Sequence, residues 1–547
     1  MNLSTIVSQI KVNWKAGLTV SLVSIPLSIS LAVASQTTPV VGIVTAIWAG
    51  LIAAIFGGSK FNIVGPTGAL TGILASFAIA NGAPSLAMVA VVSGIFILVA
   101  YFFQLEKYLK FIPSSAVHGF TLGVAFIIAL NQANFALGIS GLEKHEKFID
   151  NLFETVMHLD QTSLLAFVIF SIFLALLFTC SKLVPKIPGA ILLTPFGILL
   201  GYLGSQHIIP LQLDTLQTKF GDIQATFFIR PEFHMSSPII ITAFTVAVIS
   251  ILETMISAKI ADGMTKTKHE PRKEMFGLGL ANVVAGIFGG IPATAALART
   301  SLNIKSGATH NTSAIISSVA IAVISLIFFV YFKYIPLAVI AAILVFVAVR
   351  MVEKKHFIRY IKYDSKGFLL AIIVASITVY EDPIIGILFG TALALLIFME
   401  RLSKGEYDLL VNSKHFKQAK PLSHEDLINL KGSEHVLVYS FKGALAYINC
   451  QAHIARFERP LKQYHSVVLR MREVHFIDLD GIEAMNEIIE ILYEKDKYIY
   501  MTGVNSTVDV MLQRENHTYR ELKKLGAVLP KTVDALEIAL KNKPEED

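Results

Sequence analysis

A short apolar stretch that carries an arginine sets the strongest constraint on the fold of this chain. It opens on a Gly-Gly turn and a proline, Gly289-Gly290-Ile291-Pro292, and continues through Ala293 and Thr294 to Arg299. The stretch is too short to cross a bilayer alone, and proline is favoured at the first position of a helix. An arginine inside an apolar span normally faces a polar cavity. We therefore predict a half-helix whose N-terminus begins within a membrane.

A second interrupted stretch lies far upstream and echoes the first. Ala53-Ala54-Ile55-Phe56-Gly57-Gly58 matches Ala285-Gly286-Ile287-Phe288-Gly289-Gly290, and Gly65-Pro66-Thr67-Gly68 then opens another short apolar helix. Short segments interrupted by Gly and Pro at corresponding places in two halves of a chain are typical of a transporter's binding site. Each helix N-terminus leaves backbone N–H groups unpaired and carries the positive end of the helix dipole. Two such ends that face one cavity would favour an anion.

Composition places most of the chain in a lipid bilayer. Of the 547 residues, 54% are hydrophobic and 16% are charged. The net charge of +6 fits the loop bias of a membrane protein rather than a nucleic-acid-binding surface, because the basic residues lie beside apolar runs. Cys180 and Cys450 offer neither a disulfide nor a metal site. The first apolar run is interrupted at Pro26 and leads into a second span, so a cleavable signal peptide is not expected.

Fourteen apolar segments, two of them short, predict a multi-pass protein with both termini in the cytoplasm. Lys and Arg then gather in the loops placed inside, whereas the loops placed outside are mixed or acidic, and Lys333 is the clearest exception. The predicted segments are 17–35, 39–56, 67–80, 86–104, 115–137, 163–180, 189–206, 237–260, 275–288, 294–304, 313–333, 336–350, 366–380 and 383–402.

The two halves of this series also match outside the half-helices. Lys107 to Pro113 precedes the fifth segment, and a similar run from Phe332 to Pro336 precedes the twelfth, which is the fifth of the second half. Because seven is an odd number, the second copy is inverted in the membrane. The N-termini of the two half-helices are therefore predicted to meet near the midplane.

Five motifs occur in an order that is typical of one family. They are Gly65-Pro66-Thr67-Gly68-Ala69, Ile112 to Phe120 running on to Gln132, Ala261-Asp262 with His269, Gly279-Leu280-Ala281-Asn282, and Gly289 to Pro292 with Ala298-Arg299-Thr300. These motifs resemble the SulP anion permeases, the bacterial relatives of the animal solute carriers that include prestin and the pendrin-type exchangers. The resemblance implies a core and a gate subdomain, usually in a dimer, that move sulfate, bicarbonate, chloride or dicarboxylates. It also implies that the anion lies between Gly65–Gly68 and Pro292–Thr294, with Arg299 nearby.

A carboxylate lies within the predicted eighth span. Glu253 belongs to the apolar run Ile249 to Ser257, and Ser257 lies one turn further along on the same face. One interpretation is a buried, hydrogen-bonded carboxyl that stabilises the core. The other is a group that takes up a proton and links proton movement to anion movement, with Ser257 beside it. Within the family an acidic residue here is tied to coupling, and sodium-coupled bicarbonate members tend to carry Asp; Glu favours protons and leaves sodium open.

Other candidate site residues also have structural alternatives. Arg299 could be a purely structural cation, although an arginine at mid-membrane costs at least about 2.5–3.5 kcal/mol, which favours a function. Thr67 and Thr294 could be ordinary helix caps, which does not exclude ligand binding. Many family members carry Gln after the proline of the first span, whereas Leu27 follows Pro26 here. One polar contact to the anion is thus missing, and the identity of the anion stays open.

The chain changes character after Arg401. Residues 404–432 are polar and predict a linker, residues 433–543 alternate strand and helix patterns, and 544–547 form a tail. Val467 to Gly481 resembles the STAS domain, a module shared with anti-sigma-factor antagonists and normally attached to SulP permeases. Phosphorylatable members carry Ser after the Asp, whereas Leu479 and Asp480 follow Asp478 here, so that switch is not available. A structural or dimer-stabilising role is favoured over nucleotide or partner sensing.

The predicted fold is therefore an all-α polytopic membrane domain over residues 1–403, a seven-plus-seven inverted repeat with two half-helices, followed by a small cytoplasmic α/β domain. We expect a homodimer in the bacterial inner membrane that moves a small anion by elevator-like alternating access, coupled to protons. A C4-dicarboxylate or sodium-coupled bicarbonate symporter, a nucleobase permease, an anion channel and a membrane-tethered scaffold remain open. No enzyme activity, cofactor, metal or nucleic-acid partner is expected, because catalytic and phosphate-binding motifs are missing and the histidines are scattered.

Overall fold

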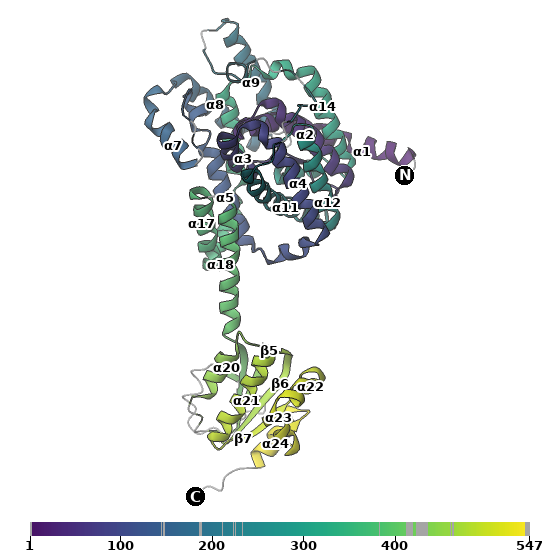
Figure 1. The fold of residues 1–547 in the computed structure, drawn as a ribbon, viewed down its shortest axis with the longest axis vertical. Coiled ribbons are helices and arrows are strands. Elements are labelled where there is room, and N and C mark those ends of the chain that lie inside the picture. Colours follow the sequence, from purple (N-terminus) through teal and green to yellow (C-terminus); the bar gives the residue numbers. More distant parts are fainter. Residues whose placement is uncertain are drawn as a thin grey trace. The chain divides into compact units, whose positions relative to one another are not determined.

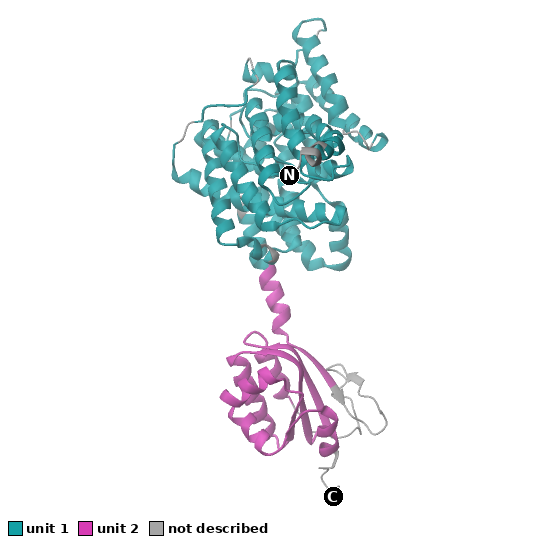
Figure 2. Cartoon of the chain, turned by 90° about the vertical axis from the view of Figure 1, so that its right-hand side faces the viewer, with its two compact units in different colours: residues 1–393 teal, residues 394–547 magenta. Residues whose placement is uncertain are grey.

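The chain divides into two compact units, residues 1–393 and 394–547 (Figure 2). The computed structural model describes residues 3–541, apart from 144, 146–147, 185–188, 210–211, 222–223, 225, 232–233, 382, 412–419, 423–435, 460 and 462–463. The predicted tail 544–547 and most of the predicted linker 404–432 lie outside the described residues.

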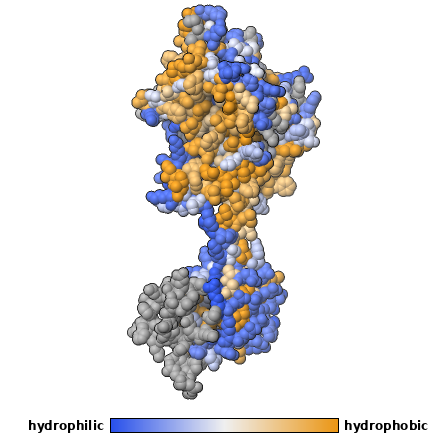
Figure 3. All heavy atoms as spheres, turned by 90° about the vertical axis from the view of Figure 1, so that its left-hand side faces the viewer, coloured by the Kyte–Doolittle hydropathy of each residue, from blue (hydrophilic) through white to orange (hydrophobic). Residues whose placement is uncertain are grey.

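Helices form at all fourteen predicted apolar segments (Figure 1). Eight of the described helices are long and apolar enough to cross a membrane, and three shorter ones are also apolar. The apolar residues gather in a broad exposed face over the first unit, coloured orange in Figure 3. The fourteen helices are α1 (Leu3–Ala34), α2 (Pro39–Phe56), α3 (Gly68–Asn81), α4 (Leu86–Phe102), α5 (Ser114–Leu130), α8 (Leu164–Leu183), α9 (Gly189–Ser205), α11 (Ser237–Thr265), α12 (Pro271–Ile287), α13 (Leu297–Lys305), α14 (Thr312–Phe332), α15 (Leu337–Met351), α17 (Ser365–Tyr380) and α18 (Pro383–Ser403).

Shorter elements connect these helices. Two minimal, buried strands, β1 and β2, pair with each other and precede the two short helices α3 and α13. The connecting elements are β1 (Val64–Gly65), η1 (Ala83–Ser85), η2 (Leu105–Phe111), α6 (Ala133–Leu137), α7 (Phe148–Met157), η3 (Leu159–Gln161), α10 (Leu216–Phe220), β2 (Thr294–Ala295) and α16 (Lys354–Tyr363).

The helices of the first unit pack in two groups. In one group α12 lies against α4 and α2, and α1 lies against α14; in the other, α17 lies against α5, and α15 lies against α5 and α8. Small residues allow the closest approaches, as expected where helices associate in lipid. A Cβ on Gly94 of α4 would lie 2.6 Å from the Gly279 carbonyl of α12, and one on Gly119 of α5 would lie 2.3 Å from the Ala371 carbonyl of α17.

The second unit is built around a six-stranded sheet in the order β4-β3-β5-β6-β7-β8. Strands β5 to β8 are parallel, whereas β3 and β4 add an antiparallel edge. Because β3 pairs along β5, the predicted linker 404–432 begins inside this sheet. The elements are β3 (Glu406–Val411), β4 (Lys420–Leu422), β5 (Val436–Leu445), α20 (Cys450–Phe457), β6 (Ser466–Ile477), α21 (Leu479–Glu494), β7 (Tyr498–Thr502), α22 (Ser506–Glu515), α23 (His517–Lys524), β8 (Val528–Leu529) and α24 (Thr532–Lys541).

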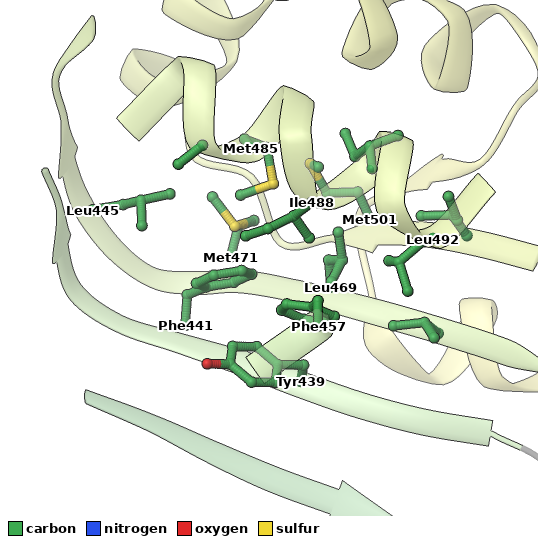
Figure 4. Close-up of a cluster of buried hydrophobic side chains, with 14 of the residues drawn as sticks. Tyr439, Phe441, Leu445, Phe457, Leu469, Met471, Met485, Ile488, Leu492 and Met501 are labelled. Carbon is green, nitrogen blue, oxygen red and sulfur yellow. The ribbon is translucent and has the colours of Figure 1, made fainter. Parts of the chain in front are cut away.

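One face of this sheet carries a large apolar cluster. Tyr439, Phe441 and Phe457 lie beside Met471 and Met485 in its centre (Figure 4). Val438 and Val468 belong to a second buried cluster, so the strands are covered on both faces, and strands of this kind form the near-continuous apolar runs from which the sequence predicted this sheet. The cluster gives the second unit a core of its own.

A buried histidine adjoins this apolar cluster. His453 of α20 is 1% exposed, and its Nδ1 accepts a hydrogen bond from the Tyr439 hydroxyl at 2.8 Å. Arg456 donates to the same hydroxyl and to the Lys404 carbonyl, next to the start of β3. Burial, reinforced by the Arg456 cation, lowers the pKa of His453 to about 3. His453 is therefore neutral in the folded unit at neutral pH.

Candidate functional site

The two interrupted segments meet through their strands. Val64 pairs with Ala295 and Gly65 with Thr294 in antiparallel register, and the Ala296 N–H extends the ladder to the Ile63 carbonyl at 3.1 Å. Helix α3 begins three residues after Gly65, and α13 begins three residues after Thr294. An antiparallel pair of this kind has the local two-fold symmetry that an inverted repeat requires. The two helix N-termini therefore lie on either side of one small sheet.

The second half-helix begins later than the sequence predicts. It starts at Leu297 rather than at 294, and Pro292 does not open it. The cause is that the preceding backbone has other partners: Asn282 of α12 accepts from the Ala293 N–H at 2.8 Å and donates to its carbonyl at 2.9 Å. The Asn282 side-chain amide thus satisfies both backbone groups of Ala293, as a neighbouring strand would. The chain therefore stays extended as far as Ala296.

Arg299 lies in the first turn of α13 and is 2% exposed. It donates one hydrogen bond, from Nη2 to the Pro66 carbonyl at 2.5 Å, just before α3 begins. Among the described residues no ion pair and no second acceptor engages this guanidinium. Gly65 makes room for it, since a Cβ there would lie 2.8 Å from Nη1. The cation therefore adds to the positive ends of α3 and α13, and most of its donors remain available.

Glu253 of α11 faces the start of α3. The Thr67 hydroxyl donates to Glu253 Oε2 at 3.2 Å, and it makes no capping bond to α3 although Thr67 occupies the N-cap position. Glu253 is only partly buried and interacts electrostatically with Arg299. Thr294 is not a cap either, because its hydroxyl donates to the Ser250 carbonyl at 3.1 Å. A carboxylate and a guanidinium thus share one site between two helix N-termini.

Ser257 does not join this pair. It is 1% exposed, and its hydroxyl hydrogen-bonds with Asn62 Oδ1 and Thr300 Oγ1, each at 3.0 Å. Helical spacing correctly places Ser257 one turn from Glu253, but the chain before β1 covers that turn. The predicted coupling role beside Glu253 therefore has no contact to support it.

Sequence reasoning missed a carboxylate that is buried near the site. Glu274 is 4% exposed, and its carboxylate accepts from the Gly58 and Ser59 N–H groups at 2.7 Å and from Asn62 Nδ2 at 2.6 Å. The predicted span began at 275, which assigned this residue to a loop, whereas α12 begins at Pro271. Glu274 accepts hydrogen bonds from three residues of the chain before β1, so it fixes the position of that chain beside α12.

A cavity of about 1240 Å³ lies between α3 and the ends of α5 and α17. It reaches Gly72 and Ile73 on α3, Ile127 and Gln132 near the end of α5, and Glu381 after α17. The site residues are not part of its lining. Gly68 at the start of α3 instead faces Ile128 of α5, whose Cδ1 would lie 2.5 Å from an added Cβ. The cavity thus ends about one helical turn from the site.

Comparison with known proteins identifies the family. The sequence profile of the sulfate permease family matches residues 10–374, and that of the STAS domain matches residues 428–520. The chain belongs to the sulfate permease family. It is 32% identical over 506 residues to the "Putative sulfate transporter YvdB" of Bacillus subtilis (strain 168), covering 91% of this chain and 92% of that protein. It is also 25% identical over 562 residues to the "Bicarbonate transporter BicA" of Picosynechococcus, covering 96% and 93%.

Solved structures of this permease fold agree with the architecture. The chain superposes on SLC26A9 with a TM-score of 0.83 at 15% identity, covering 98% of this chain and 91% of that one. It superposes on the transmembrane domain of a cyanobacterial BicA with a TM-score of 0.61 at 23% identity, covering 69% and 97%. The predicted resemblance and fold class are confirmed: the permease is a multi-pass membrane transporter with a C-terminal STAS domain.

The STAS domain uses Asp478 as a helix cap. Its carboxylate accepts from the Gly481 N–H at 2.8 Å and from the Tyr447 N–H at 3.1 Å, at the start of α21. Leu479 follows and is exposed. The aspartate therefore has a structural task in this permease, and no hydroxyl stands at the next two positions.

Proposed function

We propose that this permease is a secondary active symporter of a small oxyanion of the sulfate or bicarbonate class and a proton. The observation that carries the proposal is the pairing of β1 with β2, which brings two helix N-termini and the buried Arg299 to one point. Backbone N–H groups and a guanidinium together are donors for a planar or tetrahedral oxyanion. The names of the sulfate and bicarbonate transporters among the relatives support this class.

Coupling follows from the charges at the site. When Glu253 is ionised it balances Arg299, and an anion that approaches the guanidinium meets a competing carboxylate. A proton on Glu253 removes that competitor and leaves the positive charge for the anion. Proton binding thus raises the affinity for the anion, and by linkage anion binding raises the affinity for the proton by the same factor. Glu253 is partly accessible, so a proton can reach it, whereas Glu274 is enclosed by three donors.

Alternating access would require one group of helices to move relative to the other. In this proposal α1–α4 and α11–α14 carry the site past α5, α8, α9, α15 and α17, and Gly68 slides along the side chains of Ile128 and Met351. The smooth, apolar contact suits sliding better than an interlocked polar one would. We place the protein in the bacterial inner membrane, as a homodimer with both termini in the cytoplasm, in keeping with the basic loops of the sequence.

The test is uptake into proteoliposomes that contain the full-length protein. Bicarbonate, sulfate and C4-dicarboxylates are each offered with a proton gradient, with a sodium gradient and with neither. The wild type is expected to accumulate one oxyanion under the proton gradient. Glu253→Gln, which mimics the protonated state, is expected to retain anion exchange and lose stimulation by the proton gradient. Glu270→Gln, at an exposed glutamate near α12, is the matched control and should behave as wild type.

Each other outcome assigns a different function. Undiminished gradient dependence in Glu253→Gln removes this residue from coupling. Accumulation driven by sodium alone identifies a sodium symporter, and current that outruns any gradient identifies a channel. Movement of none of these anions by the wild type contradicts the proposal.

A further inference from the structure

Three side chains that can bind a metal meet outside the transport site. His118 lies in the first turns of α5, Glu353 directly precedes α16, and His356 lies in its first turn. One ligand atom from each residue lies within 4.8 Å of the other two. His356 Nε2 is 3.0 Å from Glu353 Oε2, and the His118 and His356 rings face one another with centroids 4.4 Å apart. Among the described residues this is the one group of three such side chains.

The chemistry of the group points to a particular class of ion. Two imidazoles and one carboxylate are the protein ligands of many zinc sites that keep a fourth position for water. Imidazole nitrogens select zinc and similar transition metals, whereas calcium and magnesium prefer oxygen ligands alone. All three side chains are partly buried, so an ion can enter from solvent while the ligands stay held. We propose that His118, Glu353 and His356 bind one divalent transition-metal ion of the zinc class.

Other histidine–carboxylate contacts in the chain lack this combination. His517 pairs with Glu521 on an exposed helix surface and has no second imidazole. Glu154 lies near two histidines, His145 and His158, but among the described residues the ligand atoms of these three side chains do not all come within 4.8 Å of one another. These contacts therefore serve as internal comparisons.

Metal binding would fix α16 to α5. The described side chains of α16 include no fully buried residue, and Ile358 and Ile361 are 62% and 63% exposed. Its chief packing partner is α17. An ion held by His118 on one side and by Glu353 and His356 on the other would join two segments that are far apart in sequence, as structural metal sites do. This inference does not depend on the anion or on its coupling.

The test measures zinc on the intact protein. Full-length protein in detergent, with its affinity tag removed, is stripped with a chelator and titrated with Zn²⁺ against a chromophoric competitor. After gel filtration, elemental analysis counts the bound zinc. We expect one zinc ion per chain, and at least about 100-fold weaker binding in His118→Gln and in His356→Gln, since loss of even an outer-shell partner costs about 10–100-fold. His517→Gln is the matched control and should bind as wild type.

A second readout separates site loss from misfolding. Zn²⁺ should slow hydrogen exchange in α16 of the wild type and of His517→Gln, and should leave it unchanged in His118→Gln, whose elution volume should match wild type. Zinc binding that persists at full affinity in both ligand variants would overturn the proposal. So would a wild type that binds no zinc at micromolar concentration. Tight calcium binding with no zinc preference would overturn the assigned ion class.

Discussion

Substituting Gly65 with alanine tests whether the buried guanidinium organises the site. Gly65 has no left-handed backbone angle, so alanine fits the main chain. The added methyl group would instead lie 2.8 Å from Nη1 and 3.4 Å from Nη2 of Arg299. Carbon–nitrogen contacts this short are not tolerated, and the methyl group cannot move. The guanidinium of Arg299 must therefore move, and we expect it to lose its hydrogen bond to the Pro66 carbonyl.

The magnitude follows from the bond that is lost. Arg299 makes one protein hydrogen bond, and it is 2% exposed, so water replaces that bond poorly. A hydrogen bond to a charged group contributes about 1.5–3 kcal/mol. If the displaced guanidinium also leaves the anion, the KM for the anion should rise about 10- to 150-fold, at 1.4 kcal/mol per factor of ten.

A double-mutant cycle isolates this contact. KM for the transported anion and the thermal stability of the full-length protein are measured for Gly65→Ala, Arg299→Ala and the double variant. Once Arg299 is truncated, the methyl group has nothing to displace, so Gly65→Ala should add less than about 0.5 kcal/mol in that background. Gly263→Ala, where nothing lies within 4 Å of the new Cβ, is the control. Fully additive effects, or a wild-type KM in Gly65→Ala, would refute the reasoning.

Two further predictions concern stability. Asn282→Leu leaves the fully buried Ala293 N–H and carbonyl without partners. It should lower the free energy of unfolding by about 2–6 kcal/mol and therefore lower the melting temperature. An unchanged melting temperature would contradict this prediction. The folded C-terminal unit keeps His453 neutral down to a pKa of about 3, whereas the unfolded chain binds that proton near about 6.5. That unit should therefore lose up to about 1.4 kcal/mol per pH unit below about pH 6.5. Hydrogen exchange of α20 in the full-length protein should show this slope, and His453→Gln should remove it.

Local sequence signals located the two half-helices well. Gly-Gly turns, prolines and apolar length are properties of contiguous residues, and the structure has a helix at each predicted segment. The start of α13 was misplaced because Asn282, from another helix, takes the backbone of Ala293. Helical periodicity likewise put Ser257 beside Glu253, whereas the chain around Asn62 covers Ser257.

Hydrogen bonds between residues far apart in the sequence could not be predicted from local sequence patterns. The sequence suggests that Glu274 is a charged loop residue, whereas the structure shows that Gly58, Ser59 and Asn62 all donate hydrogen bonds to its carboxylate. Strand β3 was assigned to the linker because it is only six residues long and lies within a polar part of the chain, and its pairing with β5 reveals it.

The sequence by itself determined the membrane class, the positions of the interrupted helices and the STAS module, since hydropathy, helix punctuation and motif order are all written along the chain. Only the tertiary structure decided which donors meet which acceptors, as Arg299 meets Pro66 and Thr67 meets Glu253, and which rings stack, as those of His118 and His356 do. The physical reason is that a buried polar group must find its partner in space, and the partner's direction depends on how distant helices pack.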